Sequence, residues 1–189
     1  MTGPPISQGL KQLEERALPG GGFGIQKGGE FRPDATAWAI MALNALGTAG
    51  ELMEASRQRL AGAQLGDGRV PISPDYSEST WPTTLAVLAW QGAPSCQEAQ
   101  KKAVAFLLST SGLHWKKEPE SVIGHDPELK GWSWLSDTSS WCEPTSMAMM
   151  ALQTAGYGGH SRLEEGRRLL MDRQIPGGGW HYGNTTVFA

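Results

Sequence analysis

The sequence predicts an all-α protein built as a curved array of helical hairpins in two layers, and three observations support this prediction. A segment of helical character recurs along the 189-residue chain, a glycine-rich turn precedes each copy, and two kinds of helix alternate. A chain of this length has room for one domain with a substantial core. We therefore expect residues 1–189 to form a single unit.

Three segments of equal length end in glycine. Segments 34–47 and 143–156 match at an acidic residue, a threonine, a Met-Ala-Leu run and the final glycine, and segment 79–92 lies between them. Glycine is the residue that most easily adopts the left-handed conformation in which many helices end. Each segment therefore predicts a helix that stops at its closing glycine.

A glycine-rich turn with a large apolar residue lies upstream of each segment. The interval from Val70 to Trp132 is longer than the intervals from Phe23 to Val70 and from Trp132 to Trp180, and the extra residues are polar. This spacing predicts repeats. Their expected bounds are 19–64, 65–111 and 130–174, with an insertion at 113–130 and the start of a fourth repeat at 176.

Two kinds of helix alternate in this pattern. One kind is apolar on nearly every side and must be buried on every side, whereas the other carries charges on one face only. Alternating helices joined by short turns stack into an inner and an outer layer. The expected inner helices are 34–46, 81–91 and 143–155, and the expected outer helices are 51–64, 95–109 and 162–174.

Charge and cysteine content exclude several classes of protein. The chain has 16 Lys and Arg against 19 Asp and Glu, and no basic stripe, so we expect no nucleic-acid partner. Cys96 and Cys142 stand far apart, so neither a disulfide nor a cysteine-based zinc site is expected, and no other metal or cofactor is predicted. The N-terminal residues lack the pattern of a secretory signal. We expect a cytoplasmic protein, either free or in peripheral contact with a membrane.

Residues 174–180 have the spacing Gln-x-x-x-Gly-x-Trp, and residues 64–70 repeat it with Val70 in the tryptophan position. Together with Glu143-Pro144-Thr145 and the alternating helices, this pattern resembles the prenyltransferase and squalene oxidase repeat superfamily. These terpene cyclase-like proteins include the squalene-hopene cyclases, in which the spacing is called the QW motif. The resemblance implies an α/α toroid, here a partial ring, with an isoprenoid ligand such as a squalene-like or polyprenyl chain in its central cavity.

Two departures from the superfamily bear on activity. Class II terpene cyclases protonate their substrate with an Asp-x-Asp-Asp motif, which this sequence does not contain. Protein prenyltransferases bind zinc through an Asp-x-Cys pair and a distant histidine, whereas Ser140 and Trp141 precede Cys142. If the protein is an enzyme, the resemblance implies a terpene cyclase-like isomerase or intramolecular transferase.

Acidic and aromatic residues at the starts of the inner helices are the candidates for chemistry. A helix N-terminus stabilises negative charge, so capping alone explains an acid there, but a carboxyl group at the rim of an apolar cavity can also protonate an alkene or epoxide. Aromatic rings can stabilise a carbocation or simply plug the space between hairpins. The candidate catalytic residues are Asp34 and Glu143, and the candidate ligand-binding residues are Trp81, Trp132, Trp134, Trp141, Trp180 and Tyr182.

Three functions are compatible with these residues. The first is a terpene cyclase-like protein, a cyclase relative or fragment, that binds an isoprenoid or another apolar small molecule in a central cavity. The second is a non-catalytic scaffold or lipid-binding repeat domain. The third is a carbohydrate-active α/α barrel, which would require Asp34 and Glu143 to meet across the cavity. We rank it last because these acids lie two repeats apart.

The predicted array has no polar capping repeat at either end, so its terminal helix faces should associate. We expect sedimentation to show a dimer or a larger species. A monomer that unfolds cooperatively at all concentrations would contradict this prediction.

Overall fold

The structure is a computed structural model that describes residues 4–48, 50–121 and 123–180. These residues form helices joined by turns and loops, and the pairings between extended segments among them are isolated bridges rather than strands. The predicted all-α fold class is confirmed.

Three helix pairs make up most of the structure. The helices α2, α4 and α6 form one layer and the helices α3, α5 and α7 form the other, with α1 preceding them. Their bounds are α1 Pro4–Glu14, α2 Pro33–Ala45, α3 Glu51–Gly62, α4 Pro82–Ala89, α5 Gln97–Ser109, α6 Cys142–Leu152 and α7 Ser161–Asp172. Three short helical segments complete the set: η1 Pro74–Tyr76, η2 Pro94–Cys96 and η3 Gln153–Tyr157.

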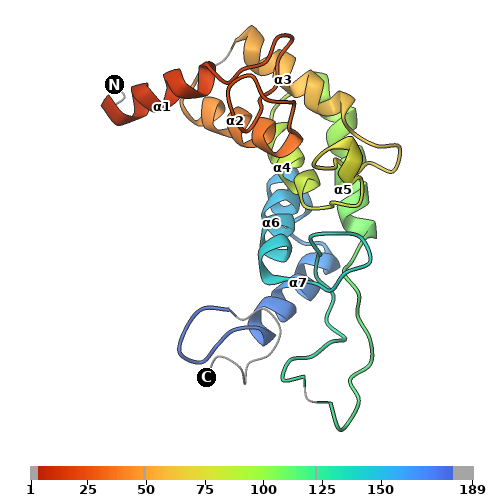
Figure 1. Ribbon diagram of the computed structural model, residues 1–189. Helices are drawn as coiled ribbons and strands as arrows, with labels where there is room; N and C mark the ends of the chain where they lie inside the picture. The colour runs from red at the N-terminus through yellow and green to blue at the C-terminus, as the bar shows by residue number, and fades with distance from the viewer. Residues whose placement is uncertain (1–3, 49, 122, 181–189) are drawn as a thin grey trace.

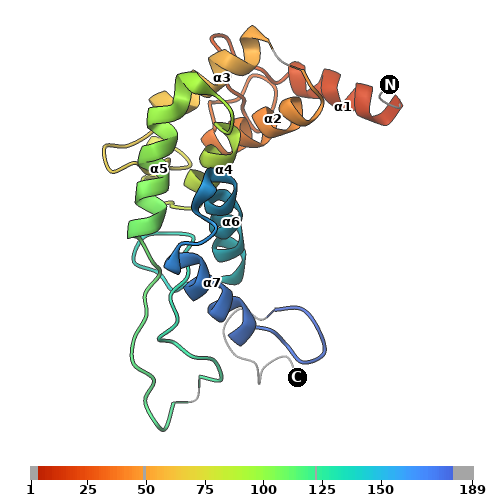
Figure 2. The ribbon, with the colours of Figure 1, turned by 180° about the vertical axis from the view of Figure 1, so that it is seen from behind.

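The layers curve as an open arc. Helix α4 packs between α2 and α6, and each of these three helices also packs against the helix that follows it, α3, α5 or α7. Figure 1 shows that α1 and the segment after α7 project from the two ends of the arc toward the same side, and Figure 2 shows the same arrangement from behind. The arc therefore has a concave side, along which the inner helices run, and a convex side.

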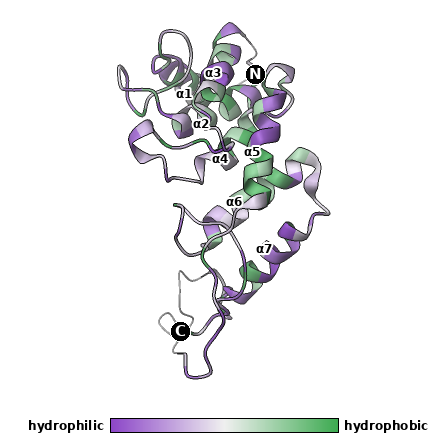
Figure 3. Cartoon of the chain, turned by 90° about the vertical axis from the view of Figure 1, so that its right-hand side faces the viewer, coloured by the Kyte–Doolittle hydropathy of each residue, from purple (hydrophilic) through white to green (hydrophobic). Residues whose placement is uncertain are grey.

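Burial follows the composition of each helix. Helix α4 buries seven of its eight residues, whereas α7 buries only Leu163, Gly166 and Leu169 of twelve. In Figure 3 the hydrophobic colour gathers along α4 and α6, and α7 is largely hydrophilic. Helices α2 and α6 depart from the expected burial on every side, because Trp38 and Met150 are each 56% exposed.

Helix α1 is an element that the repeat pattern does not predict. Its residues Leu10 and Leu13, with Ala17 just beyond it, pack against the core at helical spacing. It stands before the turn at 18–23 as α3 stands before the turn at 65–70. The repeat pattern does not predict α1, because the first expected repeat begins at residue 19, after this helix ends.

A buried threonine fastens each glycine-rich turn to the inner helix that follows. The backbone N–H groups of Phe23, Val70 and Trp132 donate to the hydroxyls of threonines 13 residues later, at 2.9, 2.9 and 3.0 Å. Each hydroxyl in turn donates to the carbonyl of the same turn residue. The three threonines, Thr36, Thr83 and Thr145, are fully buried.

Glycines let the turns approach the outer helices closely. Gly21 and Gly68 have φ values of +90° and +95°, which side chains rarely adopt. A Cβ atom on Gly21 would lie 2.5 Å from the carbonyl carbon of Ala55, and one on Gly68 would lie 2.3 Å from the carbonyl oxygen of Lys102. These contacts place the turns directly against α3 and α5.

No helix among the described residues combines the length and apolar character needed to cross a bilayer.

We predict that Thr83→Val destabilises the protein by about 1–3 kcal/mol, because the buried N–H of Val70 loses the hydroxyl that accepts its hydrogen bond. The measurement is the free energy of unfolding in urea. Thr83→Ser, which keeps the hydroxyl, should be closer to wild type. Thr154→Val is the control, since Thr154 is exposed. Equal stabilities of Thr83→Val and Thr154→Val would contradict this role.

Candidate functional site

An apolar groove runs between α1 and α2, and we call it the α1–α2 groove. Its volume is about 480 Å³, within the range of small-molecule sites. Arg16 is the one charged residue on its wall. The groove is lined by Leu13, Arg16, Phe23, Gly24, Ile25, Ala35, Trp38, Ala39 and Ala42.

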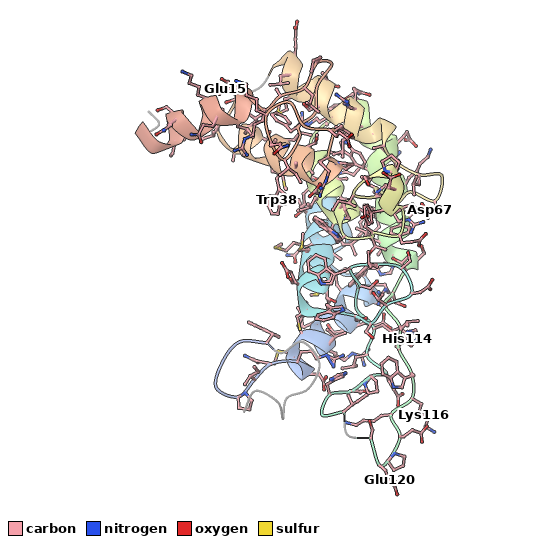
Figure 4. All side chains as sticks on the ribbon, in the orientation of Figure 1. Glu15, Trp38, Asp67, His114, Lys116 and Glu120 are labelled. Carbon is pink, nitrogen blue, oxygen red and sulfur yellow. The ribbon has the colours of Figure 1, made fainter. Side chains whose placement is uncertain are left out.

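The sequence of α2 creates this groove. Ala35, Ala39 and Ala42 stand at helical spacing, so their small side chains leave space along one face of the helix. Trp38 borders that space and is 56% exposed, and Ile25, which also lines the groove, is 57% exposed. Figure 4 shows Trp38 on the concave side of the arc. Contiguous exposed apolar surface is a feature of sites that bind other molecules.

Two of the predicted aromatic residues meet at the start of α4. The rings of Trp81 and Trp134 are 5.7 Å apart and nearly perpendicular. The backbone N–H of Thr80 donates to the carbonyl of Trp134 at 3.0 Å and holds the two segments together. Trp81 also lines a second pocket of about 480 Å³ with Phe31 and Tyr76. The sequence predicts both rings as candidate ligand-binding residues, but it does not predict that they contact each other.

The other predicted aromatic residues lie apart from this pair. Trp132 is 4% exposed, and its indole N–H donates to the carbonyl of Leu107 at 2.8 Å, so it plugs the space between hairpins. The guanidinium of Arg162 lies 4.2 Å from the Trp132 ring. Trp180 is 53% exposed and donates to the carbonyl of Leu170. Tyr182 lies outside the described residues.

The two predicted acids stand in different surroundings. Asp34, in the first turn of α2, accepts hydrogen bonds from Arg32 on both carboxylate oxygens, at 2.9 and 3.0 Å. Glu143, in the first turn of α6, is exposed. Helix α4 packs between α2 and α6 (Figure 1). The carboxylates of Asp34 and Glu143 therefore stand on two different helix pairs.

Trp141 lines a smaller pocket of about 260 Å³ beneath the 113–130 insertion, together with Arg173. Burial raises the pKa of the adjacent Cys142 thiol, an effect that Arg173 opposes. Burial also lowers the pKa of Arg173, and Asp172 opposes that shift. A thiol with a raised pKa is a poor zinc ligand or nucleophile. Within residues 4–48, 50–121 and 123–180, no cluster of three or more His, Cys, Asp or Glu side chains could hold a metal ion.

Trp38 is the residue that sequence reasoning missed. The sequence predicts that its helix is buried on all sides, so Trp38 is not among the candidate ligand-binding residues. The spacing of three alanines around it was the available signal.

This geometry defines a class of fold, a two-layered array of helix pairs with an apolar concave side. No protein-family model matches the sequence, and no curated protein matches it. Solved structures do match. The apo structure of the type II terpene cyclase MstE from Scytonema has a TM-score of 0.59 and 16% sequence identity, over 90% of this chain and 48% of that chain.

A second structure of a variant of the same cyclase, in complex with its product merosterolic acid A, gives a TM-score of 0.59 and 16% identity, over 90% of this chain and 49% of that chain. At this identity the likeness concerns the fold alone. The protein therefore has a terpene cyclase-like fold, and it spans about half the length of these cyclases.

We predict that both thiols react slowly with Ellman's reagent in the native protein at neutral pH. Burial raises the pKa of Cys96 as well as that of Cys142, so at a given pH less of each is thiolate than in a solvated cysteine. Reaction rates measured across a urea series should rise with unfolding. A native thiol that reacts as fast as those of the unfolded chain would contradict the prediction.

Proposed function

We propose that the protein binds an isoprenoid or a similarly elongated apolar molecule in the α1–α2 groove, without cyclising it. The observation that carries this proposal is the half-exposed Trp38 beside the row of small alanines. The ligand would cover the Trp38 ring and the alanine face together.

The energetics of the groove favour an apolar ligand. Removing apolar surface from water contributes roughly 25 cal/mol per Å², and an aromatic ring is the largest such surface that one residue offers. The groove offers no carboxylate, and the guanidinium of Arg16 already donates to the carbonyl of Ile25 at 3.4 Å. A polar ligand would find few partners along this wall.

The comparison with solved structures supports the same ligand class. The cyclase with a similar fold was solved with merosterolic acid A, its product. The fold likeness covers about half of that protein, so we transfer the class of ligand as a proposal and not the reaction.

The surroundings of the two acids support binding without cyclisation. Protonation of an alkene requires a carboxylic acid that is held neutral in an apolar site. Both oxygens of Asp34 are engaged by Arg32, and Glu143 is exposed to water. In this proposal Asp34 and Glu143 act as helix N-terminal acids, while Trp81 and Trp134 form an aromatic rim.

We predict that Trp38→Ala weakens binding of a fluorescent farnesol analogue at least about tenfold, which corresponds to about 1.4 kcal/mol. Ala42→Phe should weaken it as well, because the added ring fills the groove from an exposed position. The measurement is fluorescence anisotropy, with Trp115→Ala as the matched control, since Trp115 is 46% exposed but lies in the insertion.

Equal affinities of the wild type, Trp38→Ala and Trp115→Ala would contradict the site. Absence of any binding would favour the scaffold function. Incubation with squalene followed by product analysis tests the second half of the proposal. A cyclised product that disappears in Asp34→Asn or Glu143→Gln would show that the chain is catalytic.

A further inference from the structure

The pocket beside Trp81 at the start of α4 is a second candidate binding site, and we call it the Tyr76 pocket. Its volume is about 480 Å³. Three segments form it, namely the loop before α2, the segment around η1 and the loop that follows Trp132. The wall residues that matter for recognition are Glu30, Arg32, Asp75, Tyr76, Trp81 and Leu135.

Large apolar side chains in this wall are accessible from outside. Tyr76 is 68% exposed, Leu135 is 45% exposed, and Trp81 is half-buried. A T-shaped contact covers at most one face of a ring, so the contact with Trp134 leaves part of the Trp81 ring open to the pocket. Exposed apolar surface rimmed by polar groups is a feature of binding sites.

The faces of aromatic rings attract cations, and three rings of this protein already have a guanidinium over them. These pairs are Arg59 with Phe31, Arg69 with Phe106 and Arg162 with Trp132, at 4.6, 5.9 and 4.2 Å from the ring centroids. Phe31 also lines the Tyr76 pocket, but Arg59 covers it, so we assign it no part in binding. Among the described residues, no guanidinium or ammonium group lies over Tyr76 or Trp81.

The charges of the wall favour a cation. The charge of Arg32 is offset by Asp34, because its Nε and Nη2 atoms donate to the two carboxylate oxygens at 2.9 and 3.0 Å. Glu30 and Asp75 are exposed, and neither forms an ion pair with another described residue. These two carboxylates attract a cation to the pocket and repel an anion.

The segments that carry these side chains are held together by Ser79, which is 2% exposed. Its hydroxyl accepts from the N–H of Ile72 at 2.7 Å and donates to the carbonyl of Tyr76 at 2.8 Å. An isolated bridge pairs Ser79 with Leu135 across the pocket wall. The wall is therefore preorganised, which lowers the entropy lost on binding.

We propose that the Tyr76 pocket binds a small organic cation that carries a trimethylammonium group. The methyl groups lie against the rings of Tyr76 and Trp81, and the carboxylates of Glu30 and Asp75 face the positive charge. A trimethylammonium group suits this wall because it has apolar surface and no N–H that needs an acceptor. The site is formed by different segments from the α1–α2 groove and does not depend on the function proposed for that groove.

The test titrates choline while following the indole N–H cross-peak of Trp81 in ¹⁵N-edited NMR spectra, assigned by its loss in Trp81→Phe. Choline should give a saturable shift. Its neutral isostere 3,3-dimethylbutanol, in which a carbon atom replaces the nitrogen, should bind at least about fivefold more weakly. Phosphocholine, which represents a lipid headgroup, should also bind more weakly than choline, because its phosphate meets the carboxylates of the wall.

Variants separate the aromatic and the ionic contributions. Tyr76→Leu, which keeps an apolar side chain but removes the ring, should weaken choline binding about threefold, whereas Tyr76→Phe should retain it. Tyr157→Leu is the matched control, because Tyr157 is 40% exposed and lies after α6.

Glu30→Gln and Asp75→Asn should each weaken choline binding about twofold at low salt, and they should leave binding of the neutral isostere unchanged. Glu98→Gln is the matched control, because Glu98 is an exposed carboxylate on α5. Trp38→Ala should not change choline binding, so the groove and this pocket are tested separately.

Four results would overturn the proposal. They are the absence of a saturable shift with choline, equal affinities for choline and its neutral isostere, equal choline affinities of Tyr76→Leu and Tyr76→Phe, and phosphocholine binding tighter than that of choline.

Discussion

The structure depends on a buried hydrogen bond between a threonine hydroxyl and the backbone of the preceding turn. Thr36, Thr83 and Thr145 each accept from and donate to one residue of a glycine-rich turn, 13 residues earlier in the chain. Because the turn residues are buried, their polar backbone groups would otherwise lack partners. Threonine supplies a hydroxyl on a side chain compact enough for a packed helix interface. This bond fixes where each inner helix begins, and thereby the position of the outer helix that packs against it.

An arc fixed in this way has two sides with different chemistry. The concave side presents small and aromatic side chains of α2, because an arc leaves exposed the inner-helix face that a closed ring would surround. The convex side presents polar loops such as that of Asp67, which supply hydroxyls and carboxylates (Figure 4). One array of helix pairs can therefore carry an apolar groove on one side and polar loops on the other, since the packed core separates them.

The candidate residues divide according to what packing does with them. Trp132 and Trp180 both donate an indole N–H to a backbone carbonyl of an outer helix, a contact that anchors each ring to that helix. Trp81 and Trp134 instead contact each other at the rim, and Asp34 is engaged by Arg32. Composition marked all of these residues as unusual. It could not separate the rings that pack between hairpins from those at the start of α4, because that difference depends on which surface each ring contacts after the hairpins stack.

By itself, the sequence determined the all-α fold class, the alternation of inner and outer helices and the approximate helix ends, because hydrophobic periodicity and helix-ending glycines are local properties. It did not reveal α1, the exposure of Trp38 or the pocket beside Tyr76. Those features depend on how far the arc closes and on which segments meet across the hairpins, as when the hydroxyl of Thr80 donates to the carbonyl of Ser133 in a distant loop. Only the tertiary structure decided them, because contacts between residues far apart in sequence form when the helix pairs pack and leave no periodic trace in the chain.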